Sequence, residues 1–132
     1  MAEQHLTQGR HILFDVWGVD PDLLNDLPRI RAAMLDAADA AGATVVDDRF
    51  HRFPAQGLSG VIVLSESHIS VHTFPEHSYA AFDVFTCGAH VDPEEACRHL
   101  LDALHAERWF VRRVLRGMQD GIVEMTAEAA DN

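Results

Sequence analysis

Residues 60–88 read GVIVLSESHISVHTFPEHSYAAFDVFTCG, and this stretch decides the fold. Three of its segments, GVIVLSE (60–66), HISVHTF (68–74) and YAAFDVFTCG (79–88), are rich in β-branched and aromatic residues. These residue types favour strands, and the breaks between the segments are short enough for hairpins. The stretch therefore predicts three consecutive antiparallel strands. It also carries serines, histidines and a glutamate that a strand does not need.

The flanking sequence adds further elements. HILFDVWGV (11–19), ATVVDDRFHRF (43–53) and RWFVRRVL (108–115) have the composition of strands. Apolar residues recur at helical spacing over residues 27–41, and Gly42 follows where a helix commonly ends. These segments predict three more strands and a first helix.

A second helix has a clear start. Asp92 is a typical N-cap residue, Pro93 occupies the first helical position and Glu95 the third. Two helices among adjacent strands predict an α+β fold: a two-layer sandwich of a mainly antiparallel sheet with both helices on one face.

Length and charge limit the classes of function. The chain of 132 residues, 48% of them hydrophobic, predicts a single domain over residues 1–132, with the acidic, alanine-rich residues 118–132 as a flexible tail. No apolar run reaches the roughly 18 residues that cross a bilayer, so we expect a cytoplasmic protein without a membrane partner. A net charge of −11 opposes binding to nucleic acid.

Nine histidines raise the question of a metal site. His68 and His72 are four residues apart, but on a strand they lie roughly 13 Å apart, too far for one ion. We therefore expect no metal site. The remaining histidines are predicted to be surface or loop residues: His5, His11, His51, His77, His90, His99 and His105.

A serine hydrolase is a second possibility that the residue types leave open. Ser65, Ser67, His68, His72 and Asp83 supply a serine, a base and an acid, although the G-x-S-x-G turn that exposes a serine nucleophile is absent. The same serines would serve equally well as polar residues on an exposed strand face. Residue types alone do not choose between these interpretations.

The run LSESHISVHTFPEHSYAAFDVFTCG (64–88) resembles the signature of the prokaryotic S-adenosylmethionine decarboxylase proenzyme family, ESH-hydrophobic-S-hydrophobic-HTWPE followed by YAAxDxFTCG. GRHILFDVWGVDP (9–21), AGATVVDDRFHRFPAQGLSGV (41–61) and GAHVDPEEA (88–96) also resemble family segments in order and spacing. The resemblance extends over residues 9–116.

The resemblance implies a pyruvoyl-dependent decarboxylase that cuts itself between Glu66 and Ser67. The Ser67 hydroxyl would attack the preceding carbonyl, and elimination from the resulting ester would leave residue 67 as the precursor of the pyruvoyl cofactor. The products would be a beta chain, 1–66, and an alpha chain, 67–132. The expected reaction converts S-adenosylmethionine to decarboxylated S-adenosylmethionine, the aminopropyl donor for spermidine.

The resemblance also assigns roles to other residues in catalysis. His72 matches the base for processing, Ser59 a serine that assists processing, and Cys87 the proton donor in decarboxylation. By residue type alone, Cys87 would more often be a small buried residue than a reactive thiol.

Substrate binding follows from the same resemblance. Phe53 and Phe74 match the residues that stack on the adenine, and Glu76 matches the acceptor for the ribose hydroxyls. Family members are homodimers whose active sites draw residues from both subunits, so we expect a second copy of the chain as partner. Phe74 stands where the family usually has Trp, which leaves arginine or ornithine as alternative substrates. A non-catalytic paralogue is less consistent, because it would be expected to have lost Ser67, His72 or Cys87.

The spacing of Ser67 and His72 predicts a feature of the backbone. Side chains alternate between the two faces of a strand, so Ser67 and His72, five residues apart, would point to opposite faces of a regular strand. The role implied for His72, as the base that acts on residue 67, requires them to share a face. We therefore expect the chain to leave regular strand geometry near Glu66 and Ser67, in a bend or hairpin turn that strains the bond to be cut.

Overall fold

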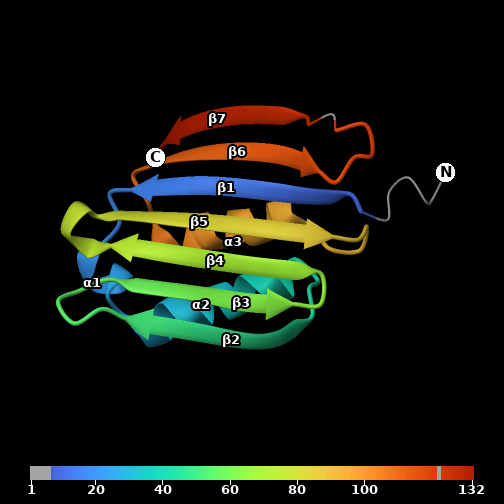
Figure 1. Cartoon of the computed structure of the whole chain (residues 1–132). Helices are drawn as coiled ribbons and strands as arrows, with labels where there is room; N and C mark the ends of the chain where they lie inside the picture. Colours follow the sequence, from blue (N-terminus) through green and yellow to red (C-terminus); the bar gives the residue numbers. More distant parts are fainter. Residues whose placement is uncertain (1–6, 122) are drawn as a thin grey trace.

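Seven strands form one antiparallel sheet (Figure 1). The computed structural model describes residues 7–121 and 123–132, so His5 lies outside the described residues. Across the sheet the strand order is β2-β3-β4-β5-β1-β6-β7. The strands are β1 (Gly9–Trp17), β2 (Val45–Arg52), β3 (Leu58–Leu64), β4 (Ser67–Phe74), β5 (Tyr79–Cys87), β6 (Arg108–Arg116) and β7 (Met125–Asp131). The three strands predicted from residues 60–88 are β3, β4 and β5, and they are neighbours as expected.

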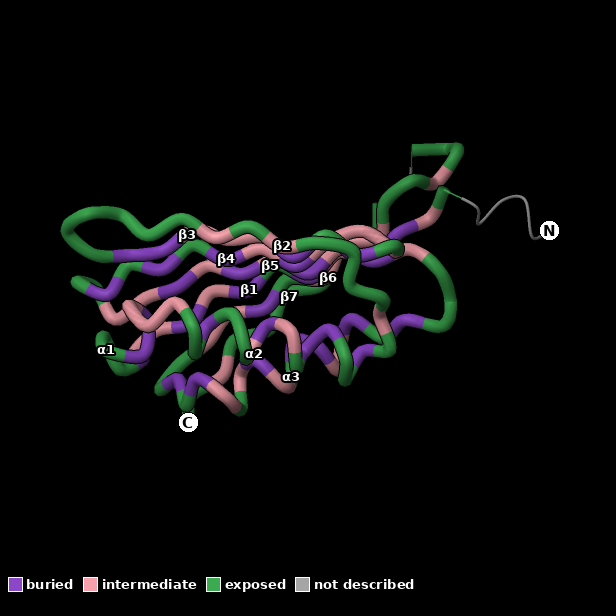
Figure 2. The backbone as a smooth tube through the Cα atoms, turned by 90° about the horizontal axis from the view of Figure 1, so that it is seen from below, coloured by how far each residue is buried: buried purple, intermediate pink, exposed green. Residues whose placement is uncertain are grey.

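Two helices cover one face of the sheet, which confirms the predicted two-layer α+β sandwich (Figure 2). They are α2 (Leu27–Ala40) and α3 (Pro93–Leu104). A short helix α1 (Pro21–Leu24) and the 3-10 turn η2 (Pro75–His77) complete the helical part. Within the described part of the chain, no helix is long and apolar enough to cross a membrane.

The helix ends follow the signals in the sequence. The Asp92 carboxylate accepts a hydrogen bond from the backbone N–H of Glu94 at 3.0 Å, and Pro93 is the first helical residue of α3. Gly42 follows the C-cap of α2 with a φ of +77°, a left-handed conformation that residues with a Cβ rarely adopt. Both predicted ends are confirmed.

The hydrophobic core lies between the helices and the sheet. Alternate residues of β1, namely Ile12, Phe14 and Val16, are at most 2% exposed. They belong to one buried cluster with Met34 of α2 and Leu100 of α3. Burial of each such side chain stabilises the fold by about 1.5–3 kcal/mol. This burial keeps the amphipathic helices packed against the sheet.

The opposite face of the sheet carries no helix and is called the open face below. It displays the alternate residues of each strand, among them Leu13 on β1 and Val63 on β3, which are 36% and 42% exposed. Phe53 and Phe74 add exposed aromatic rings at one end. Large apolar side chains gathered on an uncovered face are typical of an interaction surface.

The carboxyl-terminal segment differs from the predicted flexible tail over 118–132. Its last part forms β7, which pairs with β6 from Met125 opposite Val114 to Asp131 opposite Arg108. The side chains of β7 are nearly all exposed, so hydrophobic periodicity carried no sign of a strand. Pairing instead uses the backbone N–H and C=O groups that β6 would otherwise leave unpaired at the sheet edge.

Thr86 on β5 has the only buried side-chain oxygen in the described residues that lacks a hydrogen-bond partner. Leaving a buried hydroxyl unsatisfied costs about 1–3 kcal/mol. We expect Thr86→Val, which keeps the shape and removes the hydroxyl, to raise the free energy of unfolding by about 1 kcal/mol in urea denaturation. Thr86→Ser keeps the hydroxyl and should bring no gain. An unchanged or lower stability of the valine variant would contradict this.

Candidate active site

The bond expected to be cut lies in the hairpin between β3 and β4. Leu64 pairs with Ser67, so Ser65 and Glu66 form a two-residue turn. Ser67 has a φ of +144°, in a region that favours glycine. A non-glycine residue held there stores backbone strain of about 1–3 kcal/mol. The predicted departure from regular strand geometry is confirmed, and it falls on the serine itself.

The unusual backbone also decides which way Ser67 faces. Ile69 and Val71 of β4 are buried toward the helices, and Ser67 has the same parity in the strand. Its Oγ nevertheless lies 3.6 Å from the Sγ of Cys87. Cys87 is a free, partly exposed cysteine at the end of β5. The strained turn thus brings the serine hydroxyl and the thiol together.

The carbonyl group of Glu66 has a hydrogen-bond donor in place. The backbone N–H of Cys87 donates to the Glu66 oxygen at 2.8 Å. A donor aimed at this oxygen polarises the carbonyl and stabilises the negative charge that would develop there if a nucleophile attacked. This backbone donor could not be predicted from the sequence, because it depends on how β5 pairs beside the turn.

Ser59 and His72 form a second cluster on the open face. They are directly opposite each other across β3 and β4, and the Ser59 hydroxyl lies 2.8 Å from His72 Nδ1. They border an open cavity of about 420 Å³. This cavity is lined by Phe53, Gln56, Leu58, Ser59, His72, Thr73, Phe74 and Glu76. The structure therefore groups the residues matched to processing with those matched to substrate binding.

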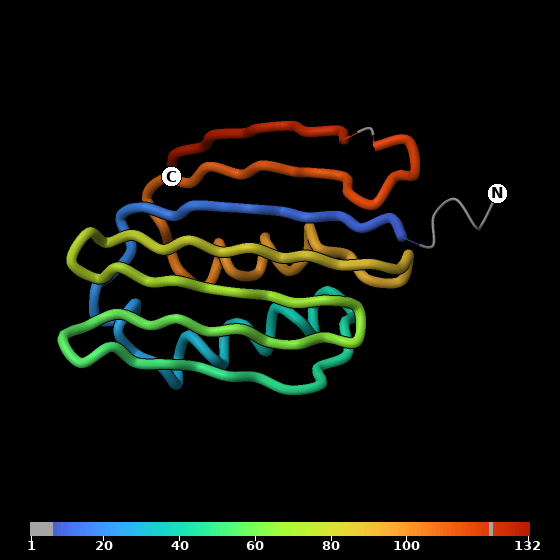
Figure 3. The backbone as a smooth tube through the Cα atoms, in the orientation of Figure 1, coloured from blue at the N-terminus to red at the C-terminus, as the bar shows by residue number. Residues whose placement is uncertain are grey.

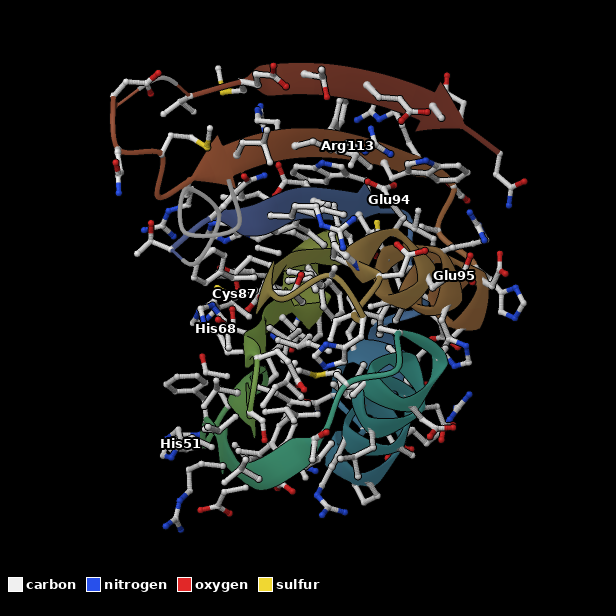
Figure 4. All side chains as sticks on the ribbon, turned by 90° about the vertical axis from the view of Figure 1, so that its right-hand side faces the viewer. His51, His68, Cys87, Glu94, Glu95 and Arg113 are labelled. Carbon is white, nitrogen blue, oxygen red and sulfur yellow. The ribbon has the colours of Figure 1, made fainter. Side chains whose placement is uncertain are left out.

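The two clusters are separate within one chain. Ser67 begins β4 and His72 follows five residues later, which corresponds to roughly 16 Å along the strand. A base that removes a proton must lie within hydrogen-bond reach of it. His72 therefore does not reach Ser67 of its own chain. Figure 4 shows His68 and Cys87 on the open face, opposite the side on which Glu94, Glu95 and Arg113 lie.

Asp83 is the centre of a polar network on the open face. It accepts hydrogen bonds from Ser70, from His11 at 2.7 Å and from His68 at 3.4 Å. Burial raises the pKa of Asp83, but the hydrogen bonds from Ser70 and His11 and the presence of His68 outweigh it and bring the pKa below its ordinary value. The prediction that His11 is a surface or loop residue is wrong, because its place on β1 beside β5 leaves the side chain only 14% exposed.

The same three residues are the only potential metal ligands that converge in the described part of the chain. Ligand atoms of His11, His68 and Asp83 all lie within 4.8 Å of one another. Arg116 lies beside them, with its Nη1 3.3 Å from His11 Nδ1. The positive charge of Arg116 repels a cation, and the oxygens of Asp83 already accept hydrogen bonds. The arrangement therefore favours a hydrogen-bond network over a bound cation.

Aromatic rings line the open face beside the second cluster. The ring centroids of Phe74 and Tyr79 are 5.5 Å apart, and those of Tyr79 and Trp17 are 4.3 Å apart. Tyr79 also donates a hydrogen bond to Asp15 at 2.7 Å. The sequence assigned no role to Tyr79 or Trp17. They come together because β1 and β5 pair with Trp17 opposite Tyr79.

The protein-family model described as S-adenosylmethionine decarboxylase matches residues 10–117. The chain is 48% identical over 112 residues to S-adenosylmethionine decarboxylase proenzyme 2 of Halalkalibacterium halodurans, which covers 85% of this chain and 88% of that protein. It is 43% identical over 119 residues to the S-adenosylmethionine decarboxylase proenzyme of Clostridium kluyveri, with coverages of 90% and 94%.

Two solved structures are similar to this chain. The crystal structure of the adenosylmethionine decarboxylase from Aquifex aeolicus matches with a TM-score of 0.75 and 36% identity, over 89% of this chain and 94% of that chain. The Trypanosoma brucei AdoMetDC monomer shares the fold, with a TM-score of 0.59 and 16% identity over 80% of this chain and 45% of that one.

These matches define a class of enzyme, a lyase made as a proenzyme with a self-derived pyruvoyl group. The chain belongs to the S-adenosylmethionine decarboxylase family.

The lowered pKa of Asp83 gives a prediction for stability against pH. Above the unfolded value near 3.8 the ionised carboxylate stabilises the folded protein, and this contribution is lost as pH falls through the lower folded value. We expect the free energy of unfolding to fall more steeply in the wild type than in Asp83→Asn below about pH 4, measured by urea denaturation. Asp102→Asn, at an exposed position on α3, should behave like the wild type. Parallel curves for wild type and Asp83→Asn would refute the expectation.

Proposed function

We propose that the bond between Glu66 and Ser67 is the one this proenzyme cuts and that Ser67 becomes its pyruvoyl group. Family membership establishes the overall activity, decarboxylation of S-adenosylmethionine for polyamine biosynthesis. The assignment to this bond rests on one observation. A strained, non-glycine Ser67 directly follows a carbonyl that already accepts a hydrogen bond from the backbone of Cys87.

The chemistry of self-cleavage follows from this geometry. The Ser67 Oγ adds to the carbonyl carbon of Glu66, and the negative charge forms on the oxygen that faces the Cys87 N–H. Breaking the carbon–nitrogen bond gives an ester and releases the strain at Ser67. Loss of the proton from the Cα of residue 67 then expels the Glu66 carboxylate. Water replaces the nitrogen of residue 67, which leaves as ammonia.

The fold keeps both products together after cleavage. Residues 1–66 supply β1, which lies between β5 and β6 of residues 67–132 (Figure 3). It pairs along its whole length with both neighbours. Separation of the two chains would require breaking both ladders and exposing the shared core, so the cut protein stays one folded unit.

A second copy of the chain completes the site. The base matched to processing, His72, lies too far from its own Ser67, and the open face presents both clusters together with exposed apolar side chains. A homodimer formed through the open faces places Ser59 and His72 of one protomer beside Ser67 and Cys87 of the other. His72 then removes the Cα proton, and Ser59 holds the imidazole by its hydrogen bond.

The decarboxylation step uses the same residues after cleavage. The pyruvoyl group supplies a carbonyl that condenses with the substrate amine and accepts the electrons released with carbon dioxide. The Cys87 thiol, next to residue 67, donates the proton that replaces the lost carboxyl group. Phe53 and Phe74 stack on the adenine, and the Glu76 carboxylate accepts hydrogen bonds from the ribose.

Cleavage is tested by mass. We expect the wild type to give two chains that separate only in denaturant, whereas Ser67→Ala remains a single chain of 14.7 kDa. Carbon dioxide release, measured with S-adenosylmethionine, arginine and ornithine side by side, should occur with S-adenosylmethionine alone. An intact wild-type chain in an active preparation, or a Ser67→Ala protein that still splits, would overturn the proposal.

Sharing of the site between protomers is tested by mixing variants. Ser67→Ala and His72→Ala should each remain uncut when expressed alone. In a mixed dimer, the Ser67 of the His72→Ala chain meets the intact His72 of the Ser67→Ala chain. We therefore expect co-expression to restore cleavage of the His72→Ala chain only, seen by intact mass. If His72 acts within its own chain, no cleavage will appear.

A further inference from the structure

The side chain of Glu66 is held more firmly than a hairpin turn requires. Its Oε1 accepts a hydrogen bond from the backbone N–H of Thr44 at 3.0 Å, and its Oε2 lies 2.9 Å from His90 Nε2. The Glu66 side chain is only 10% exposed. The Thr44 N–H, followed by His90, lowers the pKa of Glu66, so the group is a carboxylate at neutral pH.

Three connections of the fold meet at this carboxylate. The connection between α2 and β2 supplies Thr44, whose carbonyl also accepts a hydrogen bond from Ser65 at 2.9 Å. The connection between β5 and α3 supplies His90, and Asp92 ties it to the first connection by donating to the Ala41 carbonyl at 2.9 Å. The turn that contains Glu66 is the third.

Gly88 lets the imidazole of His90 come close to the turn. Its φ is +94°, and a Cβ at this position would lie 3.2 Å from the ring of His90. This contact is tighter than most Cβ contacts, so a larger residue would displace the ring. Because Gly88 has no side chain, the ring of His90 can lie over it and next to Glu66.

We propose that Thr44 and His90 clamp the Glu66 side chain and thereby hold the scissile peptide in its reactive shape. His90 is then a positioning residue for self-cleavage, an inference that rests on the proposed function. The Glu66 carbonyl is held by Cys87 and its side chain by the clamp. With both held, the peptide plane cannot rotate to relieve the positive φ of Ser67, and the strain remains available for the reaction.

The clamp also spans the cut. Thr44 belongs to residues 1–66 and His90 to residues 67–132, so after cleavage the pair between His90 and Glu66 joins the two chains. It keeps the new carboxyl end beside residue 67, where it borders the site.

The rate of self-cleavage tests the clamp. Conversion into two chains is followed on denaturing gels after pulse-labelling in cell-free synthesis. We expect His90→Ala, which loses a partly exposed contact, to slow conversion about threefold, and Glu66→Ala, which loses both contacts, about tenfold or more. His90→Gln retains an N–H donor and Glu66→Gln retains an acceptor for Thr44, so each should recover most of the rate.

Arg98→Ala is the matched control. It removes an exposed ion pair with Glu95 on α3, away from the turn, and should convert at the wild-type rate. Melting temperatures, measured for His90→Ala and His90→Gln in the uncut Ser67→Ala background, should be equal.

The outcomes separate this inference from the proposed function. If the wild type is cut and both alanine variants convert at its rate, the clamp is refuted. The same holds if His90→Gln is as slow as His90→Ala, because a lost donor would then not be the cause. A wild type that is never cut would instead overturn the proposed function.

Discussion

One backbone hydrogen bond, from the N–H of Cys87 to the carbonyl of Glu66, sets the rest of the site. It fixes the end of β5 against the turn between β3 and β4, and the next residue, Ser67, then takes a φ of +144°. That conformation brings the serine hydroxyl to the thiol of Cys87. The pairing of β5 beside the turn thus accompanies the unusual conformation of Ser67, polarises the Glu66 carbonyl and brings the Cys87 thiol next to the serine hydroxyl. Three features on which the proposed chemistry rests depend on this one strand pairing.

The sheet divides stability and chemistry between its two faces. The face toward α2 and α3 is apolar and closed, whereas the open face carries Asp83 and its partners, Ser59 with His72, and Cys87. Because side chains alternate along a strand, a slip of one residue in register would exchange the two sets. The register of β4 against β3 and β5 is therefore as important to function as the identity of the residues.

The proposed cut between residues 66 and 67 is compatible with one stable fold. Because β1 lies between β5 and β6, breaking one peptide bond at a turn removes no strand from the sheet. The distance along β4 between Ser67 and His72 has the opposite consequence. It leaves His72 out of reach of the serine in its own chain, and for this reason the proposed reaction calls on a second copy that meets the open face.

By itself, the sequence determined the α+β class, the three adjacent strands and the ends of both helices at Gly42 and Asp92, because local propensity and short motifs encode them. The roles of the site residues came from the family resemblance and remain predictions. Even the break at Ser67 followed from counting side-chain parity. The sequence could not predict β7, because the pairing of this strand uses backbone groups and buries little apolar surface. The prediction for His11 was wrong because its hydrogen-bond partner, Asp83, lies about seventy residues away in the sequence. Only the tertiary structure decided that Cys87 donates to Glu66, that Thr44 and His90 meet its side chain, and that His72 is remote from Ser67. Each of these depends on register and loop packing between distant segments, which no local pattern of residues records.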